Sequence, residues 1–149
     1  MNTSYFGKLK YIEHPIAICG WVPKFYTGKR YIKLAPKKSW FFDWKRKCEN
    51  GEYTEEQSIQ VYKKLYDETV LSQLDPHEVY KELCEIYGTD DVTLICYERP
   101  NEFCHRHLVA EWLNNAGYDV HERPYRFNDY EDVRKLMKDD KHTTDRKLF

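Results

Sequence analysis

A buried strand followed by an amphipathic helix and a second short strand occupies residues 91–121, and this segment constrains the fold most. Residues 91–96 are apolar at nearly every position, as strands buried on both faces of a parallel sheet tend to be. A helix from Cys104 carries an apolar stripe and ends at Gly117, before a strand at 118–121. The segment therefore predicts a right-handed βαβ crossover.

The rest of the chain continues this pattern of strands and helices. We predict a strand over 16–21, a helix capped by Ser39 and stopped by Gly51, and a helix opened by the capping box at 54–57. A third helix is predicted from the Asp75 cap to Gly88, and a last one from Asn128 or Asp129 through Met137. The sequence thus predicts one α/β domain over 1–149, with 138–149 a frayed tail. Its sheet is small and mainly parallel, flanked by helices in a Rossmann-like or rhodanese-like three-layer arrangement.

Composition and cysteine usage predict the setting of the protein. Of the 149 residues, 41% are hydrophobic and 33% charged, and no apolar run approaches the roughly 20 residues of a membrane span. No secretion signal is recognisable, so we expect a cytoplasmic protein without membrane contact. An odd number of cysteines without CxxC spacing favours free thiols over disulfides. They are Cys19, Cys48, Cys84, Cys96 and Cys104.

Three functional side chains gather where the helix after residue 103 begins. Cys104, His105 and Arg106 lie where unpaired backbone N–H groups and the helix dipole favour negative charge. A thiol there can have a lowered pKa, which suits a nucleophile, while His105 suits acid/base work and Arg106 an anion grip. Consecutive residues fan out around a helix, so a joint site requires at least one of them in non-helical backbone. The alternative is that His105 and Arg106 only solvate a helix end.

Cys96 has two readings, because it ends the buried strand. A buried core thiol is the favoured one, and a second nucleophile or a redox partner of Cys104 is the alternative. We expect no cofactor. Zinc is the alternative, but the spacing C-x7-C-H-x-H matches no usual zinc pattern.

A basic, aromatic stretch follows the first predicted strand. No acidic residue occurs from His14 to Phe42, whereas Lys24, Lys29 and Arg30 alternate with aromatic residues. Such surfaces bind phosphates by charge and bases by stacking, so an anionic ligand is expected, with nucleotide or nucleic acid ahead of a small acid. The alternative is a structured loop whose aromatic residues pack on the core. No Walker or GxGxxG pattern is present.

Several motifs together resemble the bacterial and phage family of domain of unknown function 488 (DUF488). They are TSYF at 3–6, PKFYTGKRY at 23–31, LAP at 34–36, LDP at 74–76, LICYE at 94–98, CHR at 104–106 and AEWL at 110–113. The resemblance implies an α/β domain with a site formed by Ser4, Tyr5, Lys29, Arg30, Cys96, Glu98, Cys104, His105 and Arg106. Relatives carry an arginine near the position of Trp21, so Arg30 or Lys24 would replace it here. The ending LNNAGY at 113–118 is similar to rhodanese-type domains in architecture only.

These features favour a Cys/His-dependent enzyme acting on a phosphate-bearing nucleotide or nucleic-acid substrate. Cys104 or Cys96 would be the nucleophile, His105 the acid/base, and Arg106 with Arg30 and Lys29 the anion clamp. One alternative is a non-catalytic binding module for nucleic acid or a nucleotide. Another is a phage or host interaction protein in which Tyr and Trp surfaces contact a partner. The sequence predicts neither the reaction nor the oligomeric state.

Overall fold

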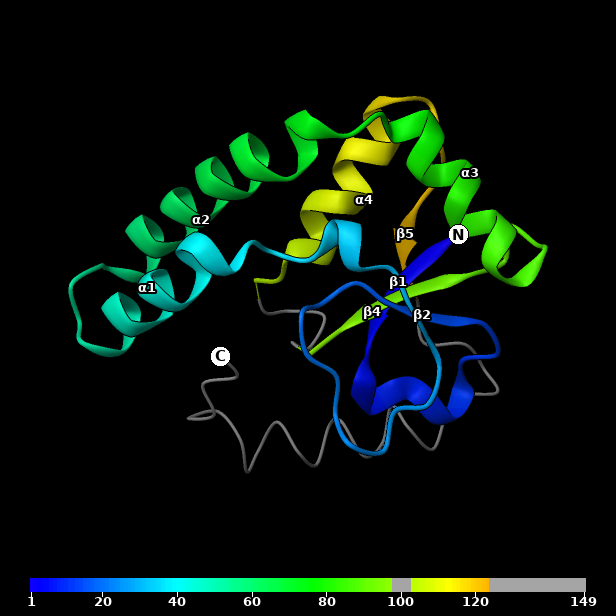
Figure 1. Ribbon diagram of the computed structural model, residues 1–149, viewed down its shortest axis with the longest axis horizontal. Helices are drawn as coiled ribbons and strands as arrows, with labels where there is room; N and C mark the ends of the chain where they lie inside the picture. The colour runs from blue at the N-terminus through cyan, green and yellow to red at the C-terminus, as the bar shows by residue number, and fades with distance from the viewer. Residues whose placement is uncertain (98–102, 124–149) are drawn as a thin grey trace.

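Five parallel strands form the sheet at the centre of the protein (Figure 1). The computed structural model describes residues 1–97 and 103–123. The strands lie in the order β3-β2-β4-β1-β5, and each pairs in parallel with its neighbours. Their bounds are β1 Asn2–Tyr5, β2 Pro15–Ala17, β3 Lys29–Arg30, β4 Thr93–Cys96 and β5 His121–Glu122. The predicted α/β fold with a mainly parallel sheet is confirmed, and all strands of the described part are parallel.

The crossover predicted from the sequence joins strands that are not neighbours. β4 leads into α4 (His105–Asn115) and then β5, but β1 lies between β4 and β5 and pairs with both. The register places Tyr5 of β1 opposite Cys96 of β4. Sequence analysis predicted no strand at residues 2–5, because this segment is short and follows no turn signal. β1, which was not predicted, brings the N-terminal segment next to Cys96 at the end of β4.

Four α-helices and three 3₁₀ helices complete the described residues. The α-helices are α1 Lys38–Glu49, α2 Glu55–Thr69, α3 Pro76–Tyr87 and α4 His105–Asn115, and the 3₁₀ helices are η1 Phe6–Tyr11, η2 Ile32–Leu34 and η3 Leu71–Gln73. The predicted Thr54 capping box and Asp75 cap are confirmed. Gly88 ends α3 as predicted, with a left-handed backbone (φ 71°) that favours glycine. The Ser39 cap is wrong: Lys37 occupies the N-cap position, and Ser39 lies within α1.

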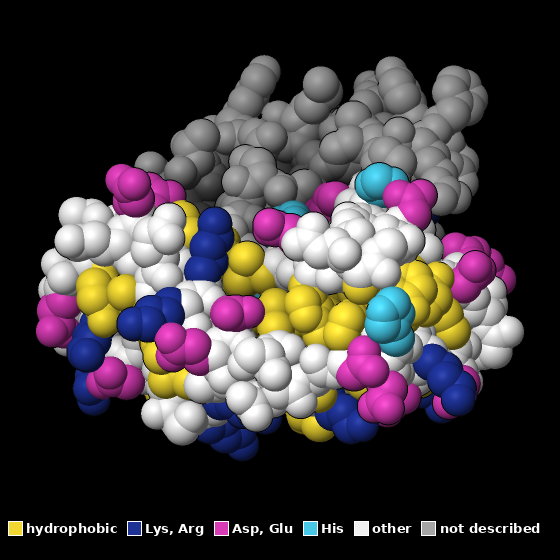
Figure 2. All heavy atoms as spheres, turned by 90° about the horizontal axis from the view of Figure 1, so that it is seen from above, with side chains coloured by type: hydrophobic (Ala, Val, Ile, Leu, Met, Phe, Trp, Pro, Cys, Tyr) yellow, Lys and Arg dark blue, Asp and Glu magenta, His cyan; other side chains and the backbone are white. Residues whose placement is uncertain are grey.

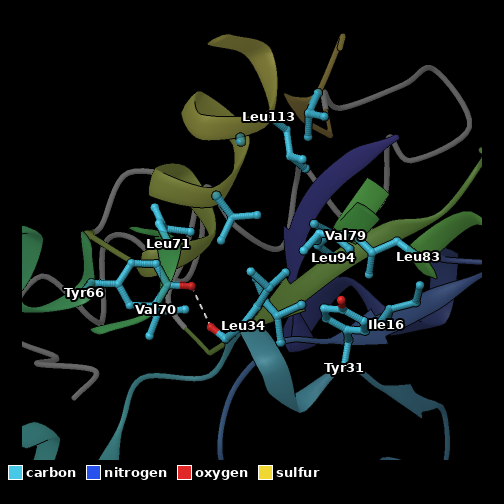
Figure 3. Close-up of a cluster of buried hydrophobic side chains, with 14 of the residues drawn as sticks. Ile16, Tyr31, Leu34, Tyr66, Val70, Leu71, Val79, Leu83, Leu94 and Leu113 are labelled. Carbon is cyan, nitrogen blue, oxygen red and sulfur yellow. Dashed lines mark hydrogen bonds between the residues drawn. The ribbon is translucent and has the colours of Figure 1, made fainter. Parts of the chain in front are cut away.

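The two faces of the sheet are covered differently. Ile16 and Leu94 point to one face, where they pack with side chains of all four α-helices in the larger core cluster. In this cluster the buried Tyr66 hydroxyl donates a hydrogen bond of 2.6 Å to the Leu34 carbonyl, which ties α2 to η2 (Figure 3). Ala17 and Ile95 point to the other face and pack with η1 and the loop after β2. The sheet is therefore the middle layer of the fold.

Other predicted boundaries shift or fall outside the described part. The strand predicted over 16–21 ends at Ala17, so residues 18–21 form a loop at the end of the sheet. α1 and α2 extend to one side of the sheet as an antiparallel pair (Figure 1). The helix predicted at 128–137 and the tail at 138–149 lie outside the described residues. None of the described helices is long and apolar enough to cross a membrane.

The capping box of α2 yields a stability prediction. The Thr54 hydroxyl accepts a hydrogen bond from the Gln57 backbone N–H at 3.1 Å, and the Gln57 side chain accepts one from the Thr54 N–H at 2.9 Å. Thr54→Ala leaves one exposed donor to water, so we expect a loss of about 1 kcal/mol in the free energy of unfolding. Urea denaturation measures it, with Thr54→Ser as the control that retains the cap.

Candidate active site

The carboxyl ends of the central strands form one wall of a cavity of about 820 Å³. In an open parallel sheet this edge is where ligands bind. β4 ends at Cys96, and the Ile18 N–H just beyond β2 donates to the Ile95 carbonyl at 3.1 Å, so the two strand ends lie side by side. α4 begins at this same edge (Figure 1).

Each wall of the cavity comes from a different element. The loop after β2 and the end of β4 supply one side, α1 and the segment before it supply another, and the residues at the start of α4 lie next to the strand ends. The lining residues are Cys19, Gly20, Trp21, Ile32, Ala35, Pro36, Lys37, Lys38, Phe41, Phe42, Trp44, Lys45, Tyr62, Cys96, Tyr97, Phe103, Cys104 and His105. The cavity thus combines cysteine sulfurs, one imidazole, aromatic rings and lysines.

The backbone at the start of α4 brings the thiols and the imidazole together. Cys104 is the N-cap residue, with an extended backbone (φ −150°, ψ 148°), and His105 is the first residue of the helix. The non-helical residue that a joint site requires is therefore Cys104. One ligand atom from each of Cys96, Cys104 and His105 lies within 4.8 Å of the others, and all three residues are buried.

Cys96 and Cys104 are joined by a disulfide bond. This corrects the expectation of free thiols for these two residues, which was based on the odd number of cysteines and the absence of CxxC spacing. Adjacent positions at a strand end and a helix start, which only the fold reveals, bring the sulfurs together. The other three cysteines, Cys19, Cys48 and Cys84, form no disulfide bond.

His105 is held as a neutral imidazole with a defined tautomer. Its Nε2 lies 2.7 Å from the Ile18 carbonyl oxygen, which can only accept, so Nε2 carries the hydrogen. The bare Nδ1 lies 3.8 Å from the Cys104 sulfur. The pKa of His105 is lowered to about 4, chiefly by burial; the hydrogen bond to Ile18 opposes this shift, and the positive charge of Arg106 contributes to it. At pH 7 the ring is therefore neutral, and the lone pair of Nδ1 faces the Cys104 sulfur.

Arg106 lies behind the sulfurs and does not line the cavity. Its side chain is fully buried, and its Nε and Nη2 donate to the two carboxylate oxygens of Glu122 at 3.0 and 2.9 Å. Its Nη1 donates to the Cys96 sulfur at 3.1 Å. Glu122 also accepts a 2.6 Å hydrogen bond from the Thr3 hydroxyl. The guanidinium is thus a fixed positive charge against Cys96.

The other residues predicted for the site lie around this cluster or outside the description. Ser4 and Tyr5 are buried in β1, and Tyr5 is the register partner of Cys96. Lys24, Lys29 and Arg30 are exposed and do not line the cavity, although Arg30 donates a 2.8 Å hydrogen bond to the carbonyl of Gly20, which does. Glu98 lies outside the described residues.

Glu122 and the lysines of the cavity belong to the site but were not among the residues predicted from the sequence. Glu122 was missed because the last strand was predicted over 118–121, whereas β5 spans His121–Glu122 and side chains alternate faces along a strand. The neighbouring His121 is instead exposed and paired with Asp119. Lys37, Lys38 and Lys45 line the cavity, but they were read only as part of a basic segment and a helix. Their position follows from where α1 begins, which was itself predicted inaccurately.

Cys96, Cys104 and His105 could also bind a metal ion when the disulfide is reduced. Two thiolates and a neutral imidazole nitrogen are the ligands that zinc prefers. The bond from Nε2–H of His105 to the Ile18 carbonyl is the usual second contact of a ligating histidine. Three ligands facing a cavity would leave a fourth position open.

The fold and the site define an α/β protein with a Cys/His cluster at the carboxyl edge of a parallel sheet. The chain belongs to the DUF488 family, because residues 22–117 match the model of the active DUF488-N3 subclade. The match includes both cysteines, His105 and Arg106, and the lysines of the cavity. No curated protein and no solved structure matches the chain.

Proposed function

We propose that the protein is a Cys/His-dependent enzyme, and that it acts on a phosphate-bearing substrate, a nucleotide or nucleic acid, in the reduced state. The observation that carries the proposal is the convergence of Cys96, Cys104 and His105 on one cavity, with Nδ1 of His105 directed at the Cys104 sulfur. The match to a subclade described as active supports catalysis. A cytoplasmic location, where thiols are kept reduced, fits this proposal.

In the proposed chemistry Cys104 is the nucleophile and His105 carries its proton. As the sulfur bonds to an electrophilic atom of the substrate, the thiol proton passes to Nδ1 and the leaving group departs with the bonding electrons; water then hydrolyses the sulfur–substrate bond and restores the thiol. An imidazolium with a pKa of about 4 is a strong acid, so it returns the proton readily to that leaving group. The start of α4 and the Arg106 guanidinium favour negative charge on the sulfurs. We therefore assign Arg106 to thiolate stabilisation.

The charge of the cavity supports an anionic substrate. Its described lining contains three lysines and no acidic residue. Elsewhere the signs are mixed: Figure 2 shows acidic and basic side chains interspersed over the face seen from above. A one-signed cavity on a chain with net charge −1 attracts anions locally. We keep Lys24, Lys29 and Arg30 as contributors to longer-range attraction, outside the cavity.

Alkylation of the reduced protein tests the nucleophile. After disulfide reduction, iodoacetamide should modify Cys104 or Cys96 at pH 6.5 at least about tenfold faster than Cys48 or Cys84, because helix and guanidinium stabilise a thiolate. Cys48 and Cys84 are matched controls in the same chain, since burial raises the pKa of both thiols. Mass spectrometry of peptides gives each rate between pH 5.5 and 9.

Other alkylation results would favour a binding module or a metal site over the proposed enzyme. Equal, slow alkylation of all thiols would exclude an activated thiolate and favour a nucleotide-binding module. Fast alkylation only after a chelator is added would assign the cluster to a metal instead. Loss of reactivity at Cys96 in Arg106→Met, with Cys48 unchanged, would confirm the role given to the guanidinium.

A further inference from the structure

We infer that the cavity is a nucleotide site in which the base stacks on Trp21 and Phe42 and the phosphate binds Lys37 and Lys38. The inference deepens the proposed function, since it takes this cavity as the substrate site. It commits to a mononucleotide, whose base and phosphate would be recognised by different walls.

Two aromatic rings supply the surface for the base. Trp21 and Phe42 both line the cavity, yet they remain 50% and 45% exposed. Their rings meet edge to face with centroids 5.0 Å apart, so one ring leaves its face open to a ligand. Aromatic faces exposed at the mouth of a cavity offer a surface on which a base can stack.

Two lysines supply the charge for the phosphate. Lys37 and Lys38 are exposed at the start of α1 and line the same cavity. The Lys38 ammonium lies 5.4 Å from the Trp21 ring centroid, so cation and aromatic face are adjacent. None of the ion pairs between described residues involves either lysine. An anion could therefore bind them without displacing an acidic side chain of the described part.

The loop after β2 connects this surface to the thiols. The Ile18 carbonyl accepts from His105, and the Cys19 thiol donates a 2.7 Å hydrogen bond to the Trp21 carbonyl. Trp21 is thus held three residues from the backbone group that orients the imidazole. A volume of about 820 Å³ lies within the range of small-molecule sites, and it accommodates a mononucleotide beside Cys104.

Binding of small ligands to the full-length Cys104→Ser variant tests the inference without turnover. Calorimetry is run with AMP, GMP, CMP and UMP, and then with the nucleoside and the ribose 5-phosphate matching the best of them. We expect at least one nucleotide to bind tenfold or more tightly than either fragment. Trp21→Leu should weaken nucleotide and nucleoside about tenfold and leave ribose 5-phosphate unchanged, whereas Trp21→Phe should restore most of the affinity. Lys37→Ala/Lys38→Ala should weaken the nucleotide and not the nucleoside.

A matched pair of lysines controls for general charge. Lys63 and Lys64 are adjacent and exposed on α2 and do not line the cavity, so Lys63→Ala/Lys64→Ala should leave binding unchanged. Equal weakening by both double variants would overturn the inference in favour of diffuse attraction, and so would ribose 5-phosphate binding as tightly as any nucleotide. If only a 5′-phosphorylated oligonucleotide binds, the ligand is a nucleic acid and the inference of a mononucleotide is overturned. If no nucleotide binds while Cys104 of the wild-type protein is reactive, the nucleotide site is excluded and the proposed enzyme stands. If a nucleotide binds while the thiols of the wild-type protein are unreactive, the nucleotide site stands and the proposed enzyme is excluded.

Discussion

Glu122→Ala should lower the free energy of unfolding by about 3 kcal/mol, the lower end of the cost of removing one partner from a buried ion pair, because the Glu122 side chain is itself 24% exposed. The Arg106 side chain has no exposed surface, and two of its three hydrogen bonds go to the Glu122 carboxylate. Without Glu122 the guanidinium stays buried with an uncompensated charge, and the Thr3 hydroxyl also loses its acceptor. Guanidinium chloride denaturation under constant redox conditions measures the loss.

The double variant Arg106→Met/Glu122→Leu is the control for this prediction. It removes both charges and retains apolar volume, so it should recover much of the lost stability. If Glu122→Ala costs less than about 1 kcal/mol, then water reaches Arg106, and its charge is not fixed against Cys96. The same variants separate stability from reactivity, because the double variant should be stable and yet show slower alkylation of Cys96.

The fold was predictable where one signal governed one element. Capping residues at Thr54 and Asp75 determined two helices, and the apolar run before Cys96 determined the central strand. β1 was not predictable in this way, because four residues between β4 and β5 are stabilised by pairing with strands about 90 and 120 positions away. Short strands depend on such long-range pairing more than on their own composition.

Three residues of the candidate site were recognisable from the sequence, but Glu122, the cavity lysines and the connections between the residues were not. Cys104, His105 and Arg106 were recognisable as chemically capable neighbours at a helix start. The disulfide to Cys96, the Glu122 partner and the Ile18 carbonyl that orients His105 all come from other segments. Each depends on strand order and on which face a side chain occupies, so a local pattern contains no signal for it.

His105 should make the protein acid-sensitive between pH 6.5 and 4. Its pKa is lowered by burial from 6.5 to about 4, so the unfolded chain binds a proton in this range and the native protein does not. Above pH 6.5 both states are neutral and no stability is lost. As the pH falls the unfolded state is favoured, by on the order of 3 kcal/mol at pH 4, and the loss from this residue then stops. Urea denaturation at half-unit steps from pH 7.5 to 4 measures the slope.

His105→Gln is the matched variant, since its amide N–H can still donate to the Ile18 carbonyl and the side chain does not titrate. The difference in unfolding free energy between wild type and this variant should shrink by on the order of 3 kcal/mol from pH 7.5 to 4, while shared carboxylates cancel. Parallel slopes for wild type and His105→Gln would show that His105 can be protonated in the native protein. The neutral Nδ1 directed at Cys104, and with it the proposed proton transfer, would then be lost.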